Sequence, residues 1–292
     1  MEEYGSRLRD PAVRLTITDH GRDGAGFLYV YPVVSRRAGG VSVGINLNPN
    51  NACNWRCIYC QVPGLVSGNA PPIDLARLEG ELGGFLDSLL RPGWMEEHVP
   101  EGSRVLRDVA FSGNGEPTSS RQFAEAVDVV VRVLRERGLV GRIEIVLITN
   151  GSFANLPEIR RGLAAMREAG GVVWFKVDSA TDAGMRAMND ARSGPERARR
   201  NLEIAARECP TWIQTMMLAL DGKPPDEEEI EAYLALVRSL VRDAVPVKGV
   251  LLYGLARPSH QPEAPRLSAL PRAWMEAMAE RIRAAGLPVL VS

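Results

Sequence analysis

The sequence predicts an α/β fold, namely a partial (β/α)6 barrel of the TIM type preceded by a small N-terminal extension. From residue 41 onward, short β-rich runs alternate with amphipathic helical stretches, which is typical of parallel strands joined by right-handed crossovers. Six such β/α units are followed by a short strand-like run at 289–291. Because a closed barrel of this type needs eight units, we expect an open sheet.

Each predicted element follows from a local pattern. The first strand, 41–47, leads into a loop with three cysteines, and helix 73–90 places apolar residues three or four positions apart on one face. The second strand, 104–111, precedes a helix that starts after a capping box formed by Ser119 and Gln122. The remaining predicted strands are 143–148, 172–177, 212–218 and 247–253, and the remaining predicted helices are 155–168, 181–208 with a break near 193–195, 226–243 and 269–285.

The predicted domain division places an N-terminal β arm at 1–40 and the barrel domain at 41–292. Residues 14–18 and 27–31 are strand-like and flank a glycine-containing segment, 21–26, so we expect a small hairpin there. In such folds the functional groups lie on loops that follow the carboxyl ends of strands. The ends of the barrel strands are therefore where chemistry is expected.

Composition limits the classes of function. The chain has 292 residues, of which 45% are hydrophobic and 24% charged, with a net charge of −1, as expected of an ordinary globular protein. No general basic field argues for nucleic acid, which could bind only through a local patch. No apolar run approaches the ~20 residues that span a bilayer, and the first residues lack the apolar segment of a signal peptide. The expected location is cytoplasmic, with no membrane partner.

Three of the four cysteines, Cys53, Cys57 and Cys60, lie within eight residues of one loop. Three thiolates on one loop suit three corners of a cubane iron–sulfur cluster and leave its fourth iron without a protein ligand. Zinc is the alternative, but a structural zinc site needs a fourth ligand, and no histidine is spaced to supply it. The remaining Cys209 stands alone and is predicted to be a structural thiol.

With aromatic Tyr59 directly before the last cysteine, this motif resembles that of the radical S-adenosylmethionine (SAM) superfamily. The resemblance implies a [4Fe–4S] cluster on Cys53, Cys57 and Cys60, whose open iron chelates SAM. It also implies reductive cleavage of SAM to a 5′-deoxyadenosyl radical that abstracts hydrogen from a substrate, with Tyr59 packed near the adenine. The chain lacks the cysteines of a second cluster, so we expect an external electron donor of the flavodoxin or ferredoxin type.

The second motif, Gly113-Asn114-Gly115-Glu116-Pro117, lies at the end of the second predicted strand. Glycines let backbone groups approach a ligand closely, although a plain turn would also explain them. The run resembles the Gly-Gly-Glu-Pro motif of radical SAM enzymes, which contacts the amino group of SAM, in a variant similar to that of tRNA wyosine-synthase-like members. The resemblance implies that Glu116 accepts a hydrogen bond from the SAM ammonium group.

Later strand ends carry further polar residues. The Thr-Asn-Gly element at 149–151 resembles one that lies near the methionine end of SAM in this superfamily, although turn chemistry alone would explain it. Lys176 and Asp178 share one face of the fourth strand, either as SAM contacts or as a core ion pair. Gln214 could face SAM or substrate, or be a hydrogen-bonded core residue. The predicted cofactor-binding residues at these ends are Thr149, Asn150, Lys176, Asp178, Ser179 and Gln214, and Arg257 is predicted to clamp a substrate carboxylate or phosphate unless it is an exposed loop residue.

Three substrate classes stay open. A small molecule or a modified nucleoside is favoured by the neutral charge and the chain length. A glycine of a partner protein is the second class, as for glycyl-radical activating enzymes. The third is tRNA, held locally by the arginines of 192–200, which solvated helix charge would also explain. A structural metal-binding module is the non-enzyme alternative, and it gives no reason for the glycine motif that accompanies the cysteines.

Overall fold

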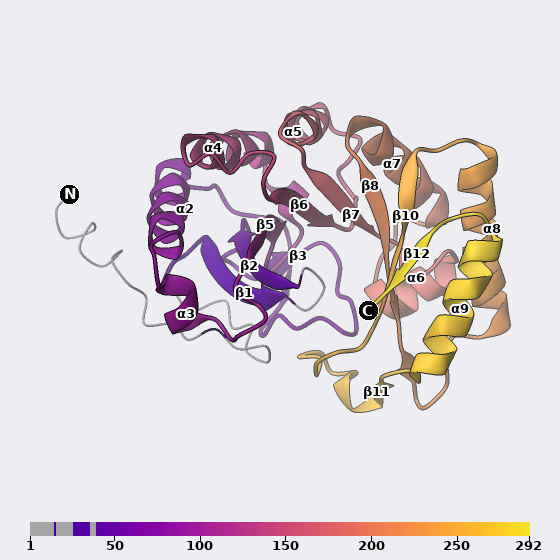
Figure 1. Cartoon of the computed structure of the whole chain (residues 1–292). Helices are drawn as coiled ribbons and strands as arrows, with labels where there is room; N and C mark the ends of the chain where they lie inside the picture. Colours follow the sequence, from indigo (N-terminus) through magenta and orange to yellow (C-terminus); the bar gives the residue numbers. More distant parts are fainter. Residues whose placement is uncertain (1–14, 16–25, 36–38) are drawn as a thin grey trace.

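The computed structural model describes residue 15, residues 26–35 and residues 39–292, and it shows an α/β fold built on one large sheet (Figure 1). Seven of the eight strands in this sheet are parallel, and the first strand lies antiparallel at one edge. Within the described part of the chain the two edge strands do not pair, so the sheet is open and the predicted partial barrel is confirmed. In spatial order the strands are β1 (Val30–Ser35), β2 (Gly40–Asn46), β5 (Leu106–Ser112), β6 (Glu144–Thr149), β7 (Val172–Lys176), β8 (Thr211–Met217), β10 (Val247–Gly254) and β12 (Val289–Val291).

Helices connect the successive parallel strands and cover the outside of the sheet (Figure 1). None of the described helices is long and apolar enough to cross a membrane. Two short strand pairs lie outside the large sheet, β3 (Ala52–Cys53) with β4 (Val66–Ser67) and β9 (Ala219–Leu220) with β11 (Leu267–Ser268). The helices are α2 (Leu75–Leu89), α3 (Trp94–His98), α4 (Phe123–Glu136), α5 (Pro157–Glu168), α6 (Asp182–Asn189), α7 (Pro195–Glu208), α8 (Glu227–Arg242) and α9 (Arg272–Ala284), with 3-10 turns at Pro117–Ser119 and Ala264–Arg266.

Alternation along the strands separates the helix-packed core from the inner face of the sheet. In β5, Val109 and Phe111 belong to the main apolar core, whereas Ala110 and Ser112 line a cavity inside the curved sheet. Successive side chains of a strand point to opposite faces, so one strand serves both the core and the cavity wall. The inward positions near the carboxyl ends of the strands are therefore available for chemistry.

The N-terminal extension contributes a strand to the main sheet. The strand expected at 27–31 begins at Val30 and runs to Ser35, where it pairs antiparallel with β2 in the register Val33 opposite Ser42. Of the other expected strand, 14–18, only Leu15 is described, and it is buried in the core. The expected hairpin between these two runs thus lies largely outside the described residues, and the division at residue 40 stays a prediction.

The capping box predicted before α4 is wrong. The α4 helix begins at Phe123 without a side-chain capping bond. The Ser119 hydroxyl instead accepts a hydrogen bond from the Ala70 backbone N–H at 2.9 Å. The Gln122 amide accepts from the Ile73 N–H at 2.7 Å and donates to the Ile73 carbonyl at 3.1 Å. These side chains bind the segment before α2, because its backbone groups lack sheet partners and need others.

Candidate active site

The cysteine loop, residues 47–67, follows β2 and is fastened to the end of α6. The backbone N–H groups of Arg56 and Ile58 donate to the carbonyls of Asn189 and Met188, each at 2.9 Å. Buried Trp55 packs against Met185 of the same helix. Since α6 follows β7, the loop after the first parallel strand is held by a helix that lies much later in the sequence.

All three clustered thiols line one cavity of about 1440 Å³. Cys53, Cys57 and Cys60 are each partly buried, and none forms a disulfide. The Trp55 backbone N–H donates to Cys53 Sγ at 3.5 Å, and the Asn189 amide donates to Cys57 Sγ at 3.2 Å. N–H donors directed at sulfur are typical of thiolates that bind metal, since they stabilise the negative charge.

Burial sets the protonation state of these thiols in the absence of metal. Desolvation raises the pKa of Cys53 to about 12 and that of Cys57 to about 11. Both groups are therefore protonated thiols at neutral pH until a metal replaces the proton. Within the described residues, no three His, Cys, Asp or Glu side chains lie close enough together to hold a single metal ion. Ligands of a cubane cluster bind different irons, so three thiols spaced around one cavity fit that donor set.

A strap formed by residues 255–263, after β10, closes one side of the cysteine loop. The Ser259 hydroxyl donates to the Ile58 carbonyl at 2.7 Å and to the Cys60 carbonyl at 3.1 Å. The His260 backbone N–H donates to the same Cys60 carbonyl at 2.9 Å. Arg56 forms two hydrogen bonds of 2.9 Å with the Glu263 carboxylate. These bonds join Cys60 to a strap that lies about 200 residues later in the sequence.

The glycine motif packs directly against the cysteine loop. A Cβ atom at Gly115 would lie 2.0 Å from the Ala52 carbonyl oxygen, which no side chain tolerates. Gly113 has a φ of +128° and would place a Cβ 2.5 Å from the side chain of Asn46. The Asn114 N–H donates to Asn46 Oδ1 at 3.0 Å. Glycine is required here because two backbones meet, which brings the turn to the edge of the thiol cavity.

Glu116 is buried, and its carboxylate binds groups from two loops. One oxygen accepts hydrogen bonds from Thr118 and from the Thr149 hydroxyl, and the other accepts from the Asn150 N–H at 2.7 Å. Burial raises the pKa of Glu116, although these donors oppose the shift. Among the described residues Oε2 has one donor, and Glu116 lines the cavity, so that oxygen can accept a further bond from a ligand.

Tyr59 lies at the centre of a buried polar network. Its hydroxyl donates to Asp178 and accepts from Lys176 Nζ at 2.5 Å. Lys176 also donates to the Tyr253 hydroxyl at 3.3 Å and lies 3.7 Å from the Asp178 carboxylate. Desolvation is the largest single influence and lowers the pKa of Lys176, but Asp178, Tyr253 and Cys57 together outweigh it, so that pKa is raised. The predicted pairing of Lys176 with Asp178 is therefore present, and Asn189 joins Asp178 to Cys57.

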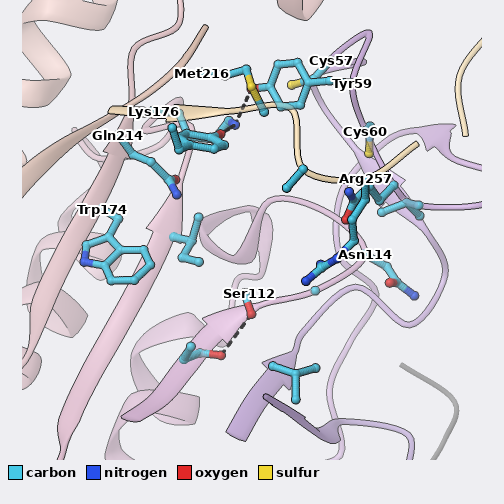
Figure 2. Close-up of a pocket in the computed structure, with 18 of the residues that line it drawn as sticks. Cys57, Tyr59, Cys60, Ser112, Asn114, Trp174, Lys176, Gln214, Met216 and Arg257 are labelled. Atoms are coloured by element: carbon cyan, nitrogen blue, oxygen red, sulfur yellow. Dashed lines mark hydrogen bonds between the residues drawn. The ribbon is translucent and has the colours of Figure 1, made fainter. Parts of the chain in front are cut away.

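The residues predicted as site residues separate into two groups. One group lines the cavity with the thiols, and Figure 2 shows several of its side chains directed into the same space. The other group lies buried behind it, and two of its members bond to the first group, Thr149 to Glu116 and Asp178 to Tyr59. The lining residues are Cys53, Cys57, Tyr59, Cys60, Gly113, Asn114, Gly115, Glu116, Asn150, Lys176, Gln214 and Arg257, and those behind them are Pro117, Thr149, Asp178 and Ser179.

Sequence reasoning missed several residues that shape this cavity. Asn189 bonds to Cys57 from a helix that carries no recognisable motif. Trp174 is half-buried on β7 and lines the cavity beside Lys176. Its two-residue spacing from Lys176 is a signal that would have found it, because both positions lie on one face of the strand. Asn46 occupies the end of β2, where polar residues are expected to be functional.

Comparison with solved structures finds the same kind of fold in other proteins. A radical SAM methyltransferase from Sphaerobacter thermophilus is 16% identical, and the match covers 90% of this chain and 68% of that one with a TM-score of 0.59. A spore photoproduct lyase mutant with bound AdoMet and dinucleoside spore photoproduct is 10% identical, with coverage of 89% and 78% and a TM-score of 0.55. At these identities the likeness concerns the fold.

The family model of the Radical SAM superfamily matches residues 47–234. This chain therefore belongs to that superfamily and is an enzyme. Members of the superfamily use a [4Fe–4S] cluster and SAM, and they generally need an external electron donor. A protein described as GTPase Obg from Brachyspira hyodysenteriae is 25% identical over 132 residues, which are 45% of this chain. The match spans only 17% of the length of that relative.

Proposed function

We propose that Cys53, Cys57 and Cys60 hold one [4Fe–4S] cluster in the large cavity and that SAM binds beside it. The bound cluster supplies the electron for cleavage of SAM to a 5′-deoxyadenosyl radical, which abstracts hydrogen from a substrate. The observation that carries this proposal is that all three thiols and the turn at 113–115 line the same cavity. Three thiols would hold such a cluster and leave one iron free to bind SAM.

The chain's own residues position SAM in this proposal. The turn at 113–115 offers backbone groups to the amino group of SAM, and Glu116 Oε2 accepts from the same ammonium. Asn150, Lys176 and Gln214 face the remaining polar groups of SAM, and Tyr59 packs near the adenine. Pro117, Thr149, Asp178 and Ser179 support this shell from behind, since they are buried and bonded to the protein. Arg257, which also lines the cavity, is assigned to the substrate.

A small molecule or a modified nucleoside is the favoured substrate. The arginines considered for tRNA are partly neutralised, because Arg199 pairs with Asp243 and with Glu203 at 3.9 Å. A glycine of a partner protein stays a second candidate, for which a stable complex with that protein would be required. The narrower likeness to wyosine-synthase-like proteins rests on the motif at 113–117 alone. A flavodoxin- or ferredoxin-like donor is proposed as the source of electrons.

The proposal is tested by anaerobic reconstitution with iron and sulfide, followed by reduction with dithionite in the presence of SAM. We expect 5′-deoxyadenosine to form, as detected by chromatography, and electron paramagnetic resonance to report a reduced [4Fe–4S] cluster. Cys57→Ala is expected to lose both signals and to keep a cooperative thermal transition, because the thiol belongs to a loop. Cys209→Ala is the matched control, since Cys209 is buried away from the cavity.

Two results would contradict the proposal. One is binding of a single zinc ion in place of a cluster, which would favour the structural metal module. The other is cluster formation that survives in Cys57→Ala but fails in Cys209→Ala, which would mean that the ligands are assigned to the wrong thiols.

A further inference from the structure

The cavity extends from the cysteine loop, at the carboxyl ends of the strands, into the interior of the curved sheet. This interior portion is its lower part. Its volume of about 1440 Å³ exceeds the roughly 300–1,000 Å³ of pockets that bury one drug-sized ligand. Beneath the thiols it is lined by inward side chains of β5, β6, β7 and β8, among them Ala110, Val146, Trp174 and Gln214. This lower part therefore has room for a second molecule beside SAM.

Gln214 supplies a polar group without a partner in this lower part. Its side chain is only 2% exposed, and its Oε1 has no hydrogen-bond partner among the described residues. Figure 2 shows the amide directed into the cavity from β8. That oxygen has almost no accessible surface, so the amide Nε2 is the atom of Gln214 that can meet a ligand in the cavity. An amide nitrogen donates, so this position is suited to a ligand that brings an acceptor.

Trp174 supplies a flat apolar wall next to that amide. It is half-buried on β7, and it packs with a small apolar cluster formed by Ala110, Val146 and Val172. In Figure 2 its ring and the Gln214 amide enter the same part of the cavity from neighbouring strands. Aromatic faces favour stacked planar partners. The nearby charge of Lys176 is balanced by Asp178 at 3.7 Å, which favours an uncharged ligand.

We propose that Trp174 and Gln214 form a substrate subsite for an uncharged planar heterocycle of the nucleobase type. In this subsite the ring stacks on Trp174, and Gln214 Nε2 donates to a ring nitrogen or carbonyl oxygen of the heterocycle. This inference deepens the proposed function and rests on it, because it assigns the lower cavity to the substrate and not to SAM. Gln214 is thereby assigned to the substrate instead of to the residues that face SAM.

The test is anaerobic titration calorimetry of the reconstituted enzyme, saturated with SAM, against guanosine, adenosine, cytidine and uridine. At least one of these nucleosides is expected to bind. The analogue of that nucleoside with its acceptor ring nitrogen replaced by C–H, or its acceptor carbonyl removed, is expected to bind at least tenfold more weakly. Gln214→Leu and Trp174→Leu are expected to lose at least tenfold in affinity, and so is Gln214→Glu, because an ionised carboxylate offers no N–H donor. Trp274→Leu is the matched control, since Trp274 lies on α9 and does not line the cavity.

The same titration on Cys57→Ala separates this inference from the proposed function. Nucleoside binding that depends on Gln214 but persists without the cluster would support the subsite even if SAM cleavage failed. Normal SAM cleavage with no binding of any of the four nucleosides would overturn the subsite and leave the proposed function standing. Loss of SAM affinity in Gln214→Leu, with SAM and nucleoside competing, would also overturn it, because Gln214 would then belong to SAM.

Discussion

The backbone N–H of Asn150 donates to Glu116 Oε2 at 2.7 Å, so a single carboxylate joins the loops that follow β5 and β6. The Asn150 side chain in turn donates to Asn54 Oδ1 of the cysteine loop at 2.9 Å. Three consecutive parallel strands are therefore linked at their carboxyl ends by one short chain of hydrogen bonds. Such a network is sensitive to the loss of any member.

Glu116→Ala is expected to lower the free energy of unfolding by about 2–4 kcal/mol, because each buried donor left unpaired costs about 1–3 kcal/mol. Glu79→Ala, which removes an exposed pair with Arg132, is the control and should cost no more than about 1 kcal/mol. Chemical denaturation measures both. Glu116→Ala should also weaken SAM binding more than iron loading, and equal loss of the two would argue against its contact with SAM.

Gly115→Ala is expected to destabilise the protein by about 1–3 kcal/mol, as overpacking does, because its Cβ would meet the Ala52 carbonyl at 2.0 Å. Gly80→Ala offers the opposite case within the same chain. Gly80 lies on α2, and a Cβ there would meet nothing within 4 Å. It should stabilise the protein by about 0.5–1 kcal/mol. Thermal denaturation checks both variants, with a lower melting temperature expected for Gly115→Ala and a higher one for Gly80→Ala. An unchanged melting temperature in Gly115→Ala would mean that the turn does not touch the cysteine loop.

Asn189→Ala is expected to leave a cluster that assembles normally but is harder to reduce. The variant loses the N–H donor to Cys57 Sγ at 3.2 Å, and hydrogen bonds to sulfur help to set the potential of such clusters. A fall on the order of 50 mV is expected, close to a tenfold change for a one-electron couple. Redox titration followed by electron paramagnetic resonance measures it. Asn201→Ala, which removes a buried bond to the Gly151 carbonyl, should leave the potential unchanged.

The metal-free protein should react slowly with iodoacetamide at Cys57. Desolvation raises the pKa of Cys57 to about 11, so its thiolate is about a thousandth of the thiol at pH 8, whereas a free cysteine has a pKa of about 8.5. The raised pKa means that reactivity should increase about tenfold per pH unit up to pH 10. Mass spectrometry of labelled peptides gives the rates, and denatured protein provides the reference. A rate equal to that of the reference at pH 8 would show that the thiol is not desolvated.

Ser259→Ala is expected to shorten the lifetime of the cluster in air. The hydroxyl donates to two carbonyls of the cysteine loop, at 2.7 and 3.1 Å, and its loss should cost about 1 kcal/mol while loosening the loop around Cys60. Decay of the visible absorbance under air follows the cluster directly. Ser239→Ala, which removes a helix hydroxyl bonded to its own helix backbone, should decay at the wild-type rate.

The local part of this architecture could be predicted from the sequence. Alternating β and α patterns predicted the parallel sheet, and the two-residue spacing of Lys176 and Asp178 placed an ion pair on one face. Contacts between distant residues could not be predicted in this way. Asn189 lies 132 residues from Cys57, and no local sequence pattern around either residue indicates that they are in contact. The capping box failed for the same reason, since Ser119 and Gln122 match a local motif but bind the segment at 70–73.

The strap also has a consequence for the time at which the metal site can mature during synthesis. Arg56 and Glu263 are 207 residues apart, which a ribosome working at about 5–20 residues per second covers in about 10–40 s. For that interval the cysteine loop has been made but lacks the strap that holds it. The thiols of a nascent chain are therefore open to oxidation or to stray metals until the strap has been synthesised, and iron–sulfur delivery belongs after that point.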